Sequence, residues 1–186
     1  TVVDQLLAGG HRVRGVDAFV PFYAEAAKRA NLAGAAGGPG FELVEADLRS
    51  ADLGPLLAEV DVVLHLAAQP GVRHSWTAFD DHLTHNVAVT QRLLEACRGR
   101  DVERFVLASS SSVYGSVPDR PTPEDHPCAP RSPYGVTKLA AEQLCLAHTE
   151  AYGVPTAVLR YFTVYGPRQR PDMALHRLVE HGLAGT

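Results

Sequence analysis

The stretch VDVVLHLAA, residues 60–68, is a nearly continuous run of hydrophobic side chains. Such a run is typical of a central strand of a parallel sheet, with both of its faces covered. Runs of similar composition lie on either side of it along the chain, at 11–17 (HRVRGVD), 41–47 (FELVEAD), 104–110 (RFVLASS) and 155–161 (PTAVLRY). We therefore expect a sheet in which residues 60–68 form a buried strand.

Segments with the apolar spacing of helices separate these strands, at 2–7, near 24–32, and at 53–59, 83–98 and 134–152. Strands that alternate with helix-length segments form right-handed βαβ units, which build a parallel sheet covered on both faces. The sequence thus predicts an α/β protein with a Rossmann-like, doubly wound parallel sheet.

Composition excludes several classes of protein. A chain of 186 residues with 46% hydrophobic and 20% charged residues is long enough to bury a core. Its apolar runs stay well short of the roughly 18 residues of a membrane span. The net charge of −4 gives no basic surface for nucleic acid. Cys97, Cys128 and Cys145 lack metal-ligand spacing and favour a reducing compartment, so we expect a cytoplasmic protein without a metal site.

The beginning of the chain differs from that of a complete dinucleotide-binding unit. Residues 2–10 (VVDQLLAGG) are typical of the last turns of a helix with a glycine stop, and a strand ending in Asp17 follows at once. In a dinucleotide-binding unit, a strand and a glycine-rich turn precede this helix. We therefore expect the chain to lack the first, central strand and the turn that holds the pyrophosphate.

Two aspartates stand at strand ends where they could serve a nucleotide. Asp17 can accept hydrogen bonds from the hydroxyls of an adenosine ribose, and Asp47 closes the next strand in the same way. Since no arginine follows Asp17 immediately, NAD is favoured over NADP. Ordinary turn chemistry explains an aspartate at a strand end equally well, and this alternative stays open.

The strongest chemical signal is a tyrosine followed four residues later by a lysine. Residues 134–138 (YGVTK) open a predicted helix downstream of the serine-rich stretch 109–115 (SSSSVYG). Helical spacing puts the Tyr134 phenol and the Lys138 ammonium on one face. A phenol with a pKa of about 10 is a poor base at neutral pH, and a neighbouring ammonium lowers that pKa. Ser110 can share the moving proton and hold a developing keto oxygen.

A chance surface pair is the alternative interpretation of these residues. With six tyrosines and two lysines in the chain, a random Tyr-x-x-x-Lys is expected about 0.06 times. The other 15 basic residues are all arginines, so a lysine at position 138 indicates a need for an ammonium group. Both observations favour a catalytic pair over coincidence.

These motifs resemble those of the NAD-dependent epimerase/dehydratase family, the extended branch of the short-chain dehydrogenases and reductases. The resemblance rests on SSSSVYG, SPYGVTK (132–138) and LRYFTVYGP (159–167). Further matches are GVDAF (15–19), EADL (45–48), HLAAQPGVRHS (65–75) and HNVAVTQRLLEA (85–96). Within the family, RPDMA (170–174) and GVDAFVPFY (15–23) are most similar to the UDP-glucuronate and UDP-glucose 4-epimerases.

The resemblance implies a role for each matching residue. Tyr134 would be the base, Lys138 its partner and Ser110 the assisting hydroxyl. The implied cofactor-binding residues are Asp17, Asp47, Leu48, Leu66, Ala67, Ala68, Asn86, Tyr134, Lys138 and Tyr161. The implied substrate-binding residues are Gln69, Arg73, Ser110, Ser111, Ser112, Thr163 and Arg170. Arg170 would meet a sugar carboxylate if the substrate is a uronate, with a solvated loop charge as its alternative.

The family resemblance also implies domains, an activity and a partner. Residues 1–166 would form an NAD-binding domain, incomplete at its N-terminus, and residues 167–186 the start of a substrate-binding lobe. The expected enzyme is an NAD-dependent nucleotide-sugar 4-epimerase that works through a transient 4-keto sugar, without nucleic acid or membrane as partners. The apolar stripe at 139–146 would be core or the helix face of a homodimer. We expect the 186-residue chain alone to bind NAD poorly and turn over little.

Alternatives within the family remain. Its 4,6-dehydratases place an acidic pair after the assisting hydroxyl residue, where this chain has Ser111 and Ser112. Serine does not transfer protons near neutral pH, which disfavours dehydration. A decarboxylase, which also resembles this chain, usually carries an acidic residue there too. A non-catalytic NAD-binding module is the remaining alternative, and it would need no base.

Three histidines have plainer interpretations. His82 and His85 have the helical spacing of metal ligands, but no third ligand is evident, so we expect a solvated helix face. His65 falls on a predicted strand and is expected to be a core histidine with satisfied hydrogen bonds. Tyr114 lacks a lysine four residues later, and we expect it to pack near the site.

Overall fold

The computed structural model describes residues 1–117 and 121–185, and the chain divides into two compact units. The first unit holds Thr1–Asp47 and Thr163–Thr186, and the second holds Leu48–Phe162. The predicted boundary after residue 166 divides the chain by function rather than by packing, and it stays a prediction.

The first unit contains a two-stranded parallel sheet. Its elements are α1 (Val2–Ala8), β1 (Val13–Asp17), α2 (Glu25–Leu32), β2 (Phe41–Glu45) and α7 (Ala174–Ala184). Val13 pairs with Phe41 and Asp17 with Glu45. Arg29 on α2 bonds to Glu45 at 2.8 Å and so ties the helix to β2. The sequence did not predict α7.

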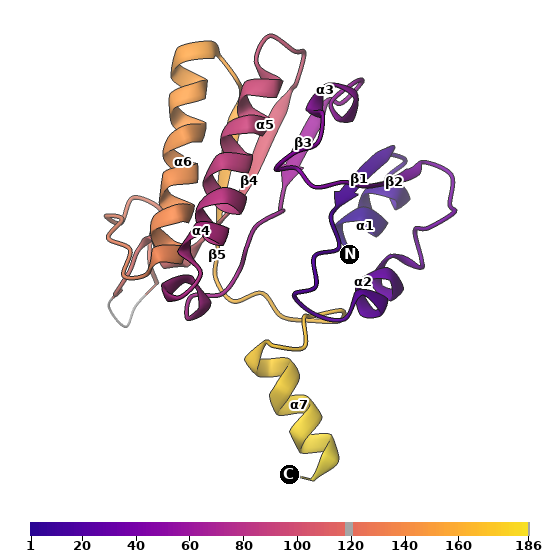
Figure 1. The fold of residues 1–186 in the computed structure, drawn as a ribbon, viewed down its shortest axis with the longest axis vertical. Coiled ribbons are helices and arrows are strands. Elements are labelled where there is room, and N and C mark those ends of the chain that lie inside the picture. Colours follow the sequence, from indigo (N-terminus) through magenta and orange to yellow (C-terminus); the bar gives the residue numbers. More distant parts are fainter. Residues whose placement is uncertain (118–120, 186) are drawn as a thin grey trace. The chain divides into compact units, whose positions relative to one another are not determined.

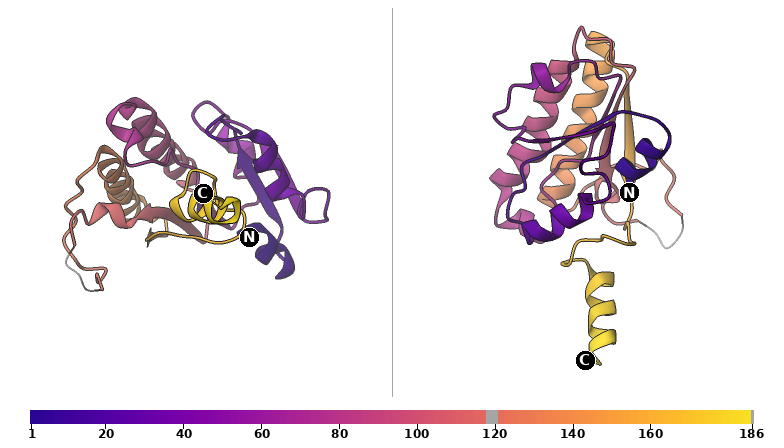
Figure 2. Two further views of the ribbon diagram at one scale, coloured as in Figure 1. Left: turned by 90° about the horizontal axis from the view of Figure 1, so that it is seen from below. Right: turned by 90° about the vertical axis from the view of Figure 1, so that its right-hand side faces the viewer.

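The second unit contains a three-stranded parallel sheet in the order β3-β4-β5. Its strands are β3 (Val62–His65), β4 (Arg104–Ser110) and β5 (Thr156–Tyr161). Its helices are α3 (Leu53–Leu56), the 3₁₀ turn η1 (His74–Trp76), α4 (Phe79–His82), the π-helical turn η2 (Leu83–Ala88), α5 (Val89–Cys97), the 3₁₀ turn η3 (Ser111–Val113) and α6 (Pro133–Tyr152). Helices α5 and α6 lie side by side against the sheet (Figure 1, Figure 2).

Strand order supports the predicted doubly wound topology. No strand of the described residues joins β1 to β3, so the strands form two separate parallel sheets. In a doubly wound sheet of order 3-2-1-4-5-6, the absence of strand 1 leaves a pair and a triplet of parallel strands in this order. The pair β1-β2 and the triplet β3-β4-β5 match the segments 3-2 and 4-5-6 of that order.

The core of the second unit lies between its sheet and helices α5 and α6. Leu94, Phe105, Ala141 and Cys145 are fully buried there. Burial of each large apolar side chain stabilises the fold by about 1.5–3 kcal/mol. The apolar faces of α5 and α6 therefore fix the position of both helices on the sheet.

The expectation of a strand buried on both faces at residues 60–68 is wrong. Strand β3 covers four residues only, and Val62 and Leu64 on it are 44% and 39% exposed. His65, on the opposite face, is buried. Helices cover one face of this sheet within the unit, so hydrophobicity alone overestimated how deeply the strand is buried.

The long helix α6 begins and ends at residues that explain its length. The Ser132 hydroxyl accepts a hydrogen bond from the Gly135 amide at 3.1 Å, and Pro133 occupies the first turn. Gly153 ends the helix in the left-handed conformation, with φ of 70°. Within the described ranges no helix is long and apolar enough to cross a membrane.

Candidate active site

Tyr134 and Lys138 lie on the first turns of α6, where the helix approaches the end of β4. A Cβ atom on Gly135 would stand 2.6 Å from the Ser112 carbonyl oxygen, so only glycine permits this approach. The Ser110 hydroxyl, at the end of β4, accepts a hydrogen bond from the Ser112 amide at 3.2 Å. The predicted catalytic residues Ser110, Tyr134 and Lys138 thus belong to segments that pack on one another.

Lys138 is a buried cation. Its side chain belongs to a residue only 5% exposed, and burial lowers the pKa of Lys138 to about 8, an effect that Glu142 opposes. None of the described residues accepts a hydrogen bond from its ammonium. A buried ammonium without an acceptor is stabilised by a ligand that places hydroxyl or other oxygen acceptors within hydrogen-bond distance.

Asn86 anchors the loop that follows β3. Its side-chain oxygen accepts from the Gln69 amide at 2.7 Å, and its Nδ2 donates to the Gln69 carbonyl and the Thr137 hydroxyl at 3.1 Å each. Asn86 lies in the π-helical turn η2, a distortion that often marks functional sites. It thereby joins the carboxyl end of β3 to the helix that carries Tyr134.

Behind Asn86, His65 is held in its neutral form. His65 Nε2 lies 3.0 Å from the Thr90 hydroxyl, which itself donates to the Asn86 carbonyl at 2.7 Å. Burial, and then the charge of Lys138, lower the pKa of His65 to about 3. The prediction of a core histidine with satisfied hydrogen bonds is confirmed.

Most of the remaining candidates of the second unit lie at the carboxyl ends of its strands or after them. Leu66 and Ala67 are exposed directly after β3, and Ala68 and Gln69 follow. Tyr161 pairs with Ser110 in the β4–β5 register and is 43% exposed. Other candidates are Leu48, which packs against the core, Arg73 before η1, and Ser111 and Ser112 in η3. Parallel strands bring such ends to one edge, where α/β proteins bind ligands.

Four candidates belong to the first unit. The Asp17 carboxylate accepts from the Phe19 amide at 2.7 Å, which is the turn chemistry given as its alternative. Arg170 pairs with Asp172 at 3.0 Å and lies over the Phe22 ring. Asp47 ends the first stretch of this unit and Thr163 begins the second. The nucleotide and substrate roles of all four stay predictions.

The chain matches the model of the NAD dependent epimerase/dehydratase family over residues 1–186. It belongs to this family. It is 47% identical, over 93% of its length, to an uncharacterized UDP-glucose epimerase, YtcB, of Bacillus subtilis, and 36% identical, over 96%, to a probable UDP-glucuronate 4-epimerase of Rhizobium meliloti. It covers 55% and 54% of those two proteins, so it spans about half the length of the curated relatives it matches.

Solved structures of the family share this fold. A UDP-glucuronic acid 4-epimerase from Bacillus cereus, in complex with UDP-glucuronic acid and NAD, matches 98% of the chain with a TM-score of 0.94 and 43% identity. DesIV, a dTDP-glucose 4,6-dehydratase from Streptomyces venezuelae with NAD bound, matches 98% with a TM-score of 0.86 and 31% identity. The chain covers 59% and 58% of these two chains.

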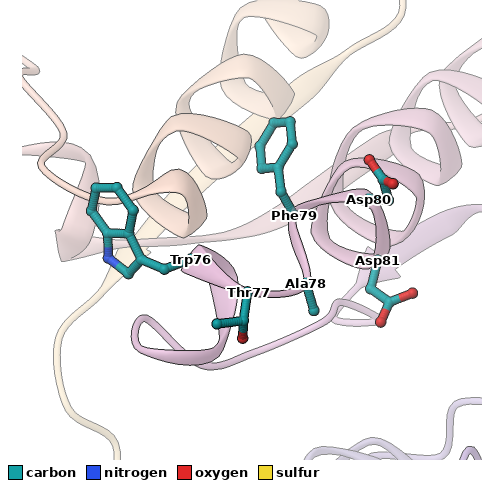
Figure 3. A pocket seen from close by; sticks show the side chains of 6 residues that line it. All are labelled: Trp76, Thr77, Ala78, Phe79, Asp80 and Asp81. Carbon is teal, nitrogen blue, oxygen red and sulfur yellow. The ribbon is translucent and has the colours of Figure 1, made fainter.

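A surface hollow of about 320 Å³ is lined by residues other than those predicted to bind in this family. Its lining is Trp76, Thr77, Ala78, Phe79, Asp80 and Asp81, from the end of η1 to the first turn of α4 (Figure 3). None of these six residues is a predicted catalytic, cofactor or substrate contact. The hollow therefore contains none of the predicted site residues.

His82 is a neighbour of Tyr134 that the sequence did not identify. Its ring is fully buried and stands edge-on to the Tyr134 ring, with 5.9 Å between centroids. Its Nε2 lies 3.4 Å from His74 Nδ1. Burial and the nearby His74 lower the pKa of His82. The expected solvated face is thus wrong for His82, and His85 is half-buried. Spacing alone could not show which side of α4 meets α6.

A second missed feature is an ion pair behind Lys138. Arg160 on β5 contacts the buried Glu142 on α6 at 2.8 Å, and the Ser109 hydroxyl donates to the same carboxylate. The sequence signal for this feature was weak, because Glu142 follows Lys138 by four residues and helical spacing pairs it with that lysine instead. Tyr114 is buried beneath Arg160, as its predicted packing role requires.

Proposed function

We propose that this chain carries the catalytic pair of an NAD-dependent nucleotide-sugar 4-epimerase of the UDP-glucuronate or UDP-glucose type. The observation that carries the proposal is the buried Lys138 ammonium one helical turn from Tyr134, at the carboxyl edge of the sheet. The relatives described above that are named as UDP-sugar epimerases, and the neighbour that binds UDP-glucuronic acid with NAD, support the substrate class.

The residues present fit a nicotinamide dinucleotide. Lys138 has no hydrogen-bond acceptor among the described residues, and the hydroxyls of a ribose would supply one. Leu66, Ala67 and Ala68 would pass along the cofactor, on a loop held by Asn86, and Asp17, Asp47 and Leu48 would serve its adenosine half. When bound, NAD would supply the hydride acceptor and donor for sugar C4.

The chain's own residues would move the proton and hold the sugar. Tyr134 would take the proton of the 4-hydroxyl group and later return it, with Lys138 stabilising the phenolate. Ser110 would donate to the developing keto oxygen. Tyr161 would contact the cofactor. The residues that would contact the sugar or its diphosphate are Gln69, Arg73, Ser111, Ser112, Thr163 and Arg170.

Epimerisation is favoured over dehydration by the residues that follow Ser110. Elimination of water across C5 and C6 needs groups that transfer protons there. The η3 turn offers Ser111 and Ser112 at these positions, and a serine hydroxyl stays protonated near neutral pH. We therefore assign a product of unchanged mass, in contrast to the loss of water or of carbon dioxide.

Turnover by a Tyr134→Phe variant of the complete protein tests this function. We expect loss of at least about a thousandfold in kcat with NAD affinity nearly unchanged, because the ring stays and the base is removed. Tyr152→Phe, on the same helix and 49% exposed, is the matched control. A near-normal rate in the Tyr134 variant contradicts the base assignment, and a wild-type protein that leaves UDP-sugars unchanged contradicts the function.

We also infer a cytoplasmic homodimer built on α6. Three free cysteines fit a reducing compartment. The stripe at 139–146 divides between core and surface, since Ala141 and Cys145 are buried while Leu146 is 56% exposed. Val136, just before the stripe on the same helix, is 48% exposed. Two such faces could pack together. Light scattering of a Leu146→Glu variant tests this: a mass unchanged from the wild type contradicts the dimer face.

A further inference from the structure

Glu142 does not pair with the lysine that its position in the sequence favours. Lys138 and Glu142 are four residues apart on α6, a spacing at which side chains of opposite charge commonly meet. Instead, Glu142 Oε2 accepts from Arg160 Nη2 at 2.8 Å and from Nε at 3.1 Å. Its Oε1 accepts from Arg160 Nε at 3.1 Å and from the Ser109 hydroxyl. Both carboxylate oxygens are thus engaged toward β4 and β5.

Arg160 is itself fixed on three sides. Its Nη1 donates to the Glu124 carbonyl at 2.8 Å, and the guanidinium lies 4.9 Å from the centroid of the Tyr114 ring. Its third contact is the forked pair with Glu142, which is 2% exposed. A planar guanidinium held this way offers a fixed binding site for a carboxylate, which a flexible ammonium cannot match.

Few charged groups interact with the Lys138 ammonium. The titratable groups that interact electrostatically with it are Glu142, one turn along α6, and His65 on β3, with Arg160 on β5 bound to Glu142. Glu142 is the carboxylate whose charge acts on Lys138 among the described residues. The direction in which Glu142 is held therefore decides how much negative charge Lys138 meets.

We propose that Arg160 is a positioning residue for Lys138. By holding the Glu142 carboxylate toward β5, Arg160 prevents an ion pair from closing along α6 and keeps the Lys138 ammonium available to the phenol of Tyr134. This inference rests on the proposed function for its catalytic meaning. Without Arg160, the buried Glu142 carboxylate would lose its partner, and Lys138 lies one helical turn away on the same helix. The ammonium would then serve Glu142 and stabilise a Tyr134 phenolate less.

The two lysines of the chain allow a direct test by nuclear magnetic resonance. With ¹³C-labelled lysine, the Cε signals report two ammonium groups, and Lys28→Arg leaves that of Lys138. We expect Arg160→Met to raise the pKa of Lys138 by about one unit, as an opposite charge within a few ångström does. Glu142→Gln should lower it, and Arg160→Met should have little effect in the Glu142→Gln background. Arg104→Met, an exposed arginine on β4, is the matched control.

A double-variant comparison separates positioning from a merely structural role. An unchanged pKa of Lys138 in Arg160→Met, or an equal rise in both backgrounds, overturns the proposal, because the effect would not pass through Glu142. If Arg160→Met does not fold, Arg160→Lys can replace it, because it keeps the charge but loses the forked contact. The proposal then requires a smaller rise in the pKa of Lys138.

Kinetics of the complete enzyme provide the second readout. Arg160→Met should lower kcat/KM at least about tenfold and move the acid limb of its pH profile to higher pH, since the phenol becomes a weaker acid. The double variant Arg160→Met/Glu142→Gln also lacks the arginine, but it should recover part of the lost kcat/KM and part of the shift in the acid limb. A double variant no better than the single contradicts the proposal. The lysine titration needs no turnover, so a protein inactive on nucleotide sugars contradicts the proposed function alone.

Discussion

His65 and Lys138 are buried in the same unit, and both have pKa values below their usual range. Burial is the larger cause in each case, and the charge of Lys138 adds to the effect on His65. The Thr90 hydroxyl gives the neutral imidazole a partner at 3.0 Å. A neutral histidine beside a buried ammonium thus spares the site a second positive charge.

Stability in acid should depend on His65. Its pKa is about 3 in the folded chain and about 6.5 when unfolded, so between these values the unfolded chain binds one more proton. The free energy of unfolding should therefore fall as the pH falls, by up to about 1.4 kcal/mol per pH unit from this group. Urea unfolding at pH 6.5 and pH 4.5 should show a smaller loss for His65→Gln than for the wild type. His11→Gln, at an exposed histidine, should lose as much as the wild type, and equal losses in all three contradict the assignment.

The predictions for His65 and His82 show how far residue spacing in the sequence can predict burial. His65 was predicted as a core residue because it follows a run of apolar side chains, and the strand places it there. His82 was predicted to be solvated because it shares a helix face with His85 at a spacing of three. The helix changes to π geometry at Leu83, directly after His82, and this shifts its phase. His82 therefore meets Tyr134, while His85 is only half-buried.

Elements with strong local signals were predicted closely. Strand β4 has the predicted bounds, and α6 begins one residue before the predicted start, at the proline after its capping serine. The predicted helix at 83–98 is instead a π turn followed by α5, because Asn86 bonds across to Gln69 and Thr137. Such long-range hydrogen bonds leave no trace in hydrophobic periodicity. The ion pair of Glu142 with Arg160 escaped prediction for the same reason.

Two glycines with left-handed backbone conformation can be compared by replacing each with alanine. Gly115 after η3 has φ of 74°, and Gly153 after α6 has φ of 70°. A Cβ atom on Gly115 would lie 2.0 Å from the Ala129 carbonyl oxygen, whereas one on Gly153 would meet nothing within 4 Å. Gly153→Ala should cost about 1 kcal/mol of unfolding free energy and Gly115→Ala about 3 kcal/mol or more. Equal losses of unfolding free energy, measured by chemical denaturation, would show that the loop before α6 shifts to relieve the clash.

Over the whole molecule, the two units differ in how much apolar surface they bury. In the first unit the buried hydrophobic residues are Phe19 and Ala35 among those described. The second unit has a continuous cluster around Leu94, Phe105 and Leu107, each at most 1% exposed. Because local stability follows buried apolar contact, the strands of the first unit should open more often.

Hydrogen exchange followed by mass spectrometry should reveal this difference. Amides of β1 and β2 should exchange at least about a hundredfold faster than those of β4, which corresponds to about 3 kcal/mol in opening free energy. Leu94→Ala removes a fully buried side chain from the second unit and should cost about 2–5 kcal/mol. That variant should raise exchange in β4 and α6 toward the rate of β1. Wild-type strands β1 and β4 with equal protection would mean that the sparse core of the first unit does not limit its stability.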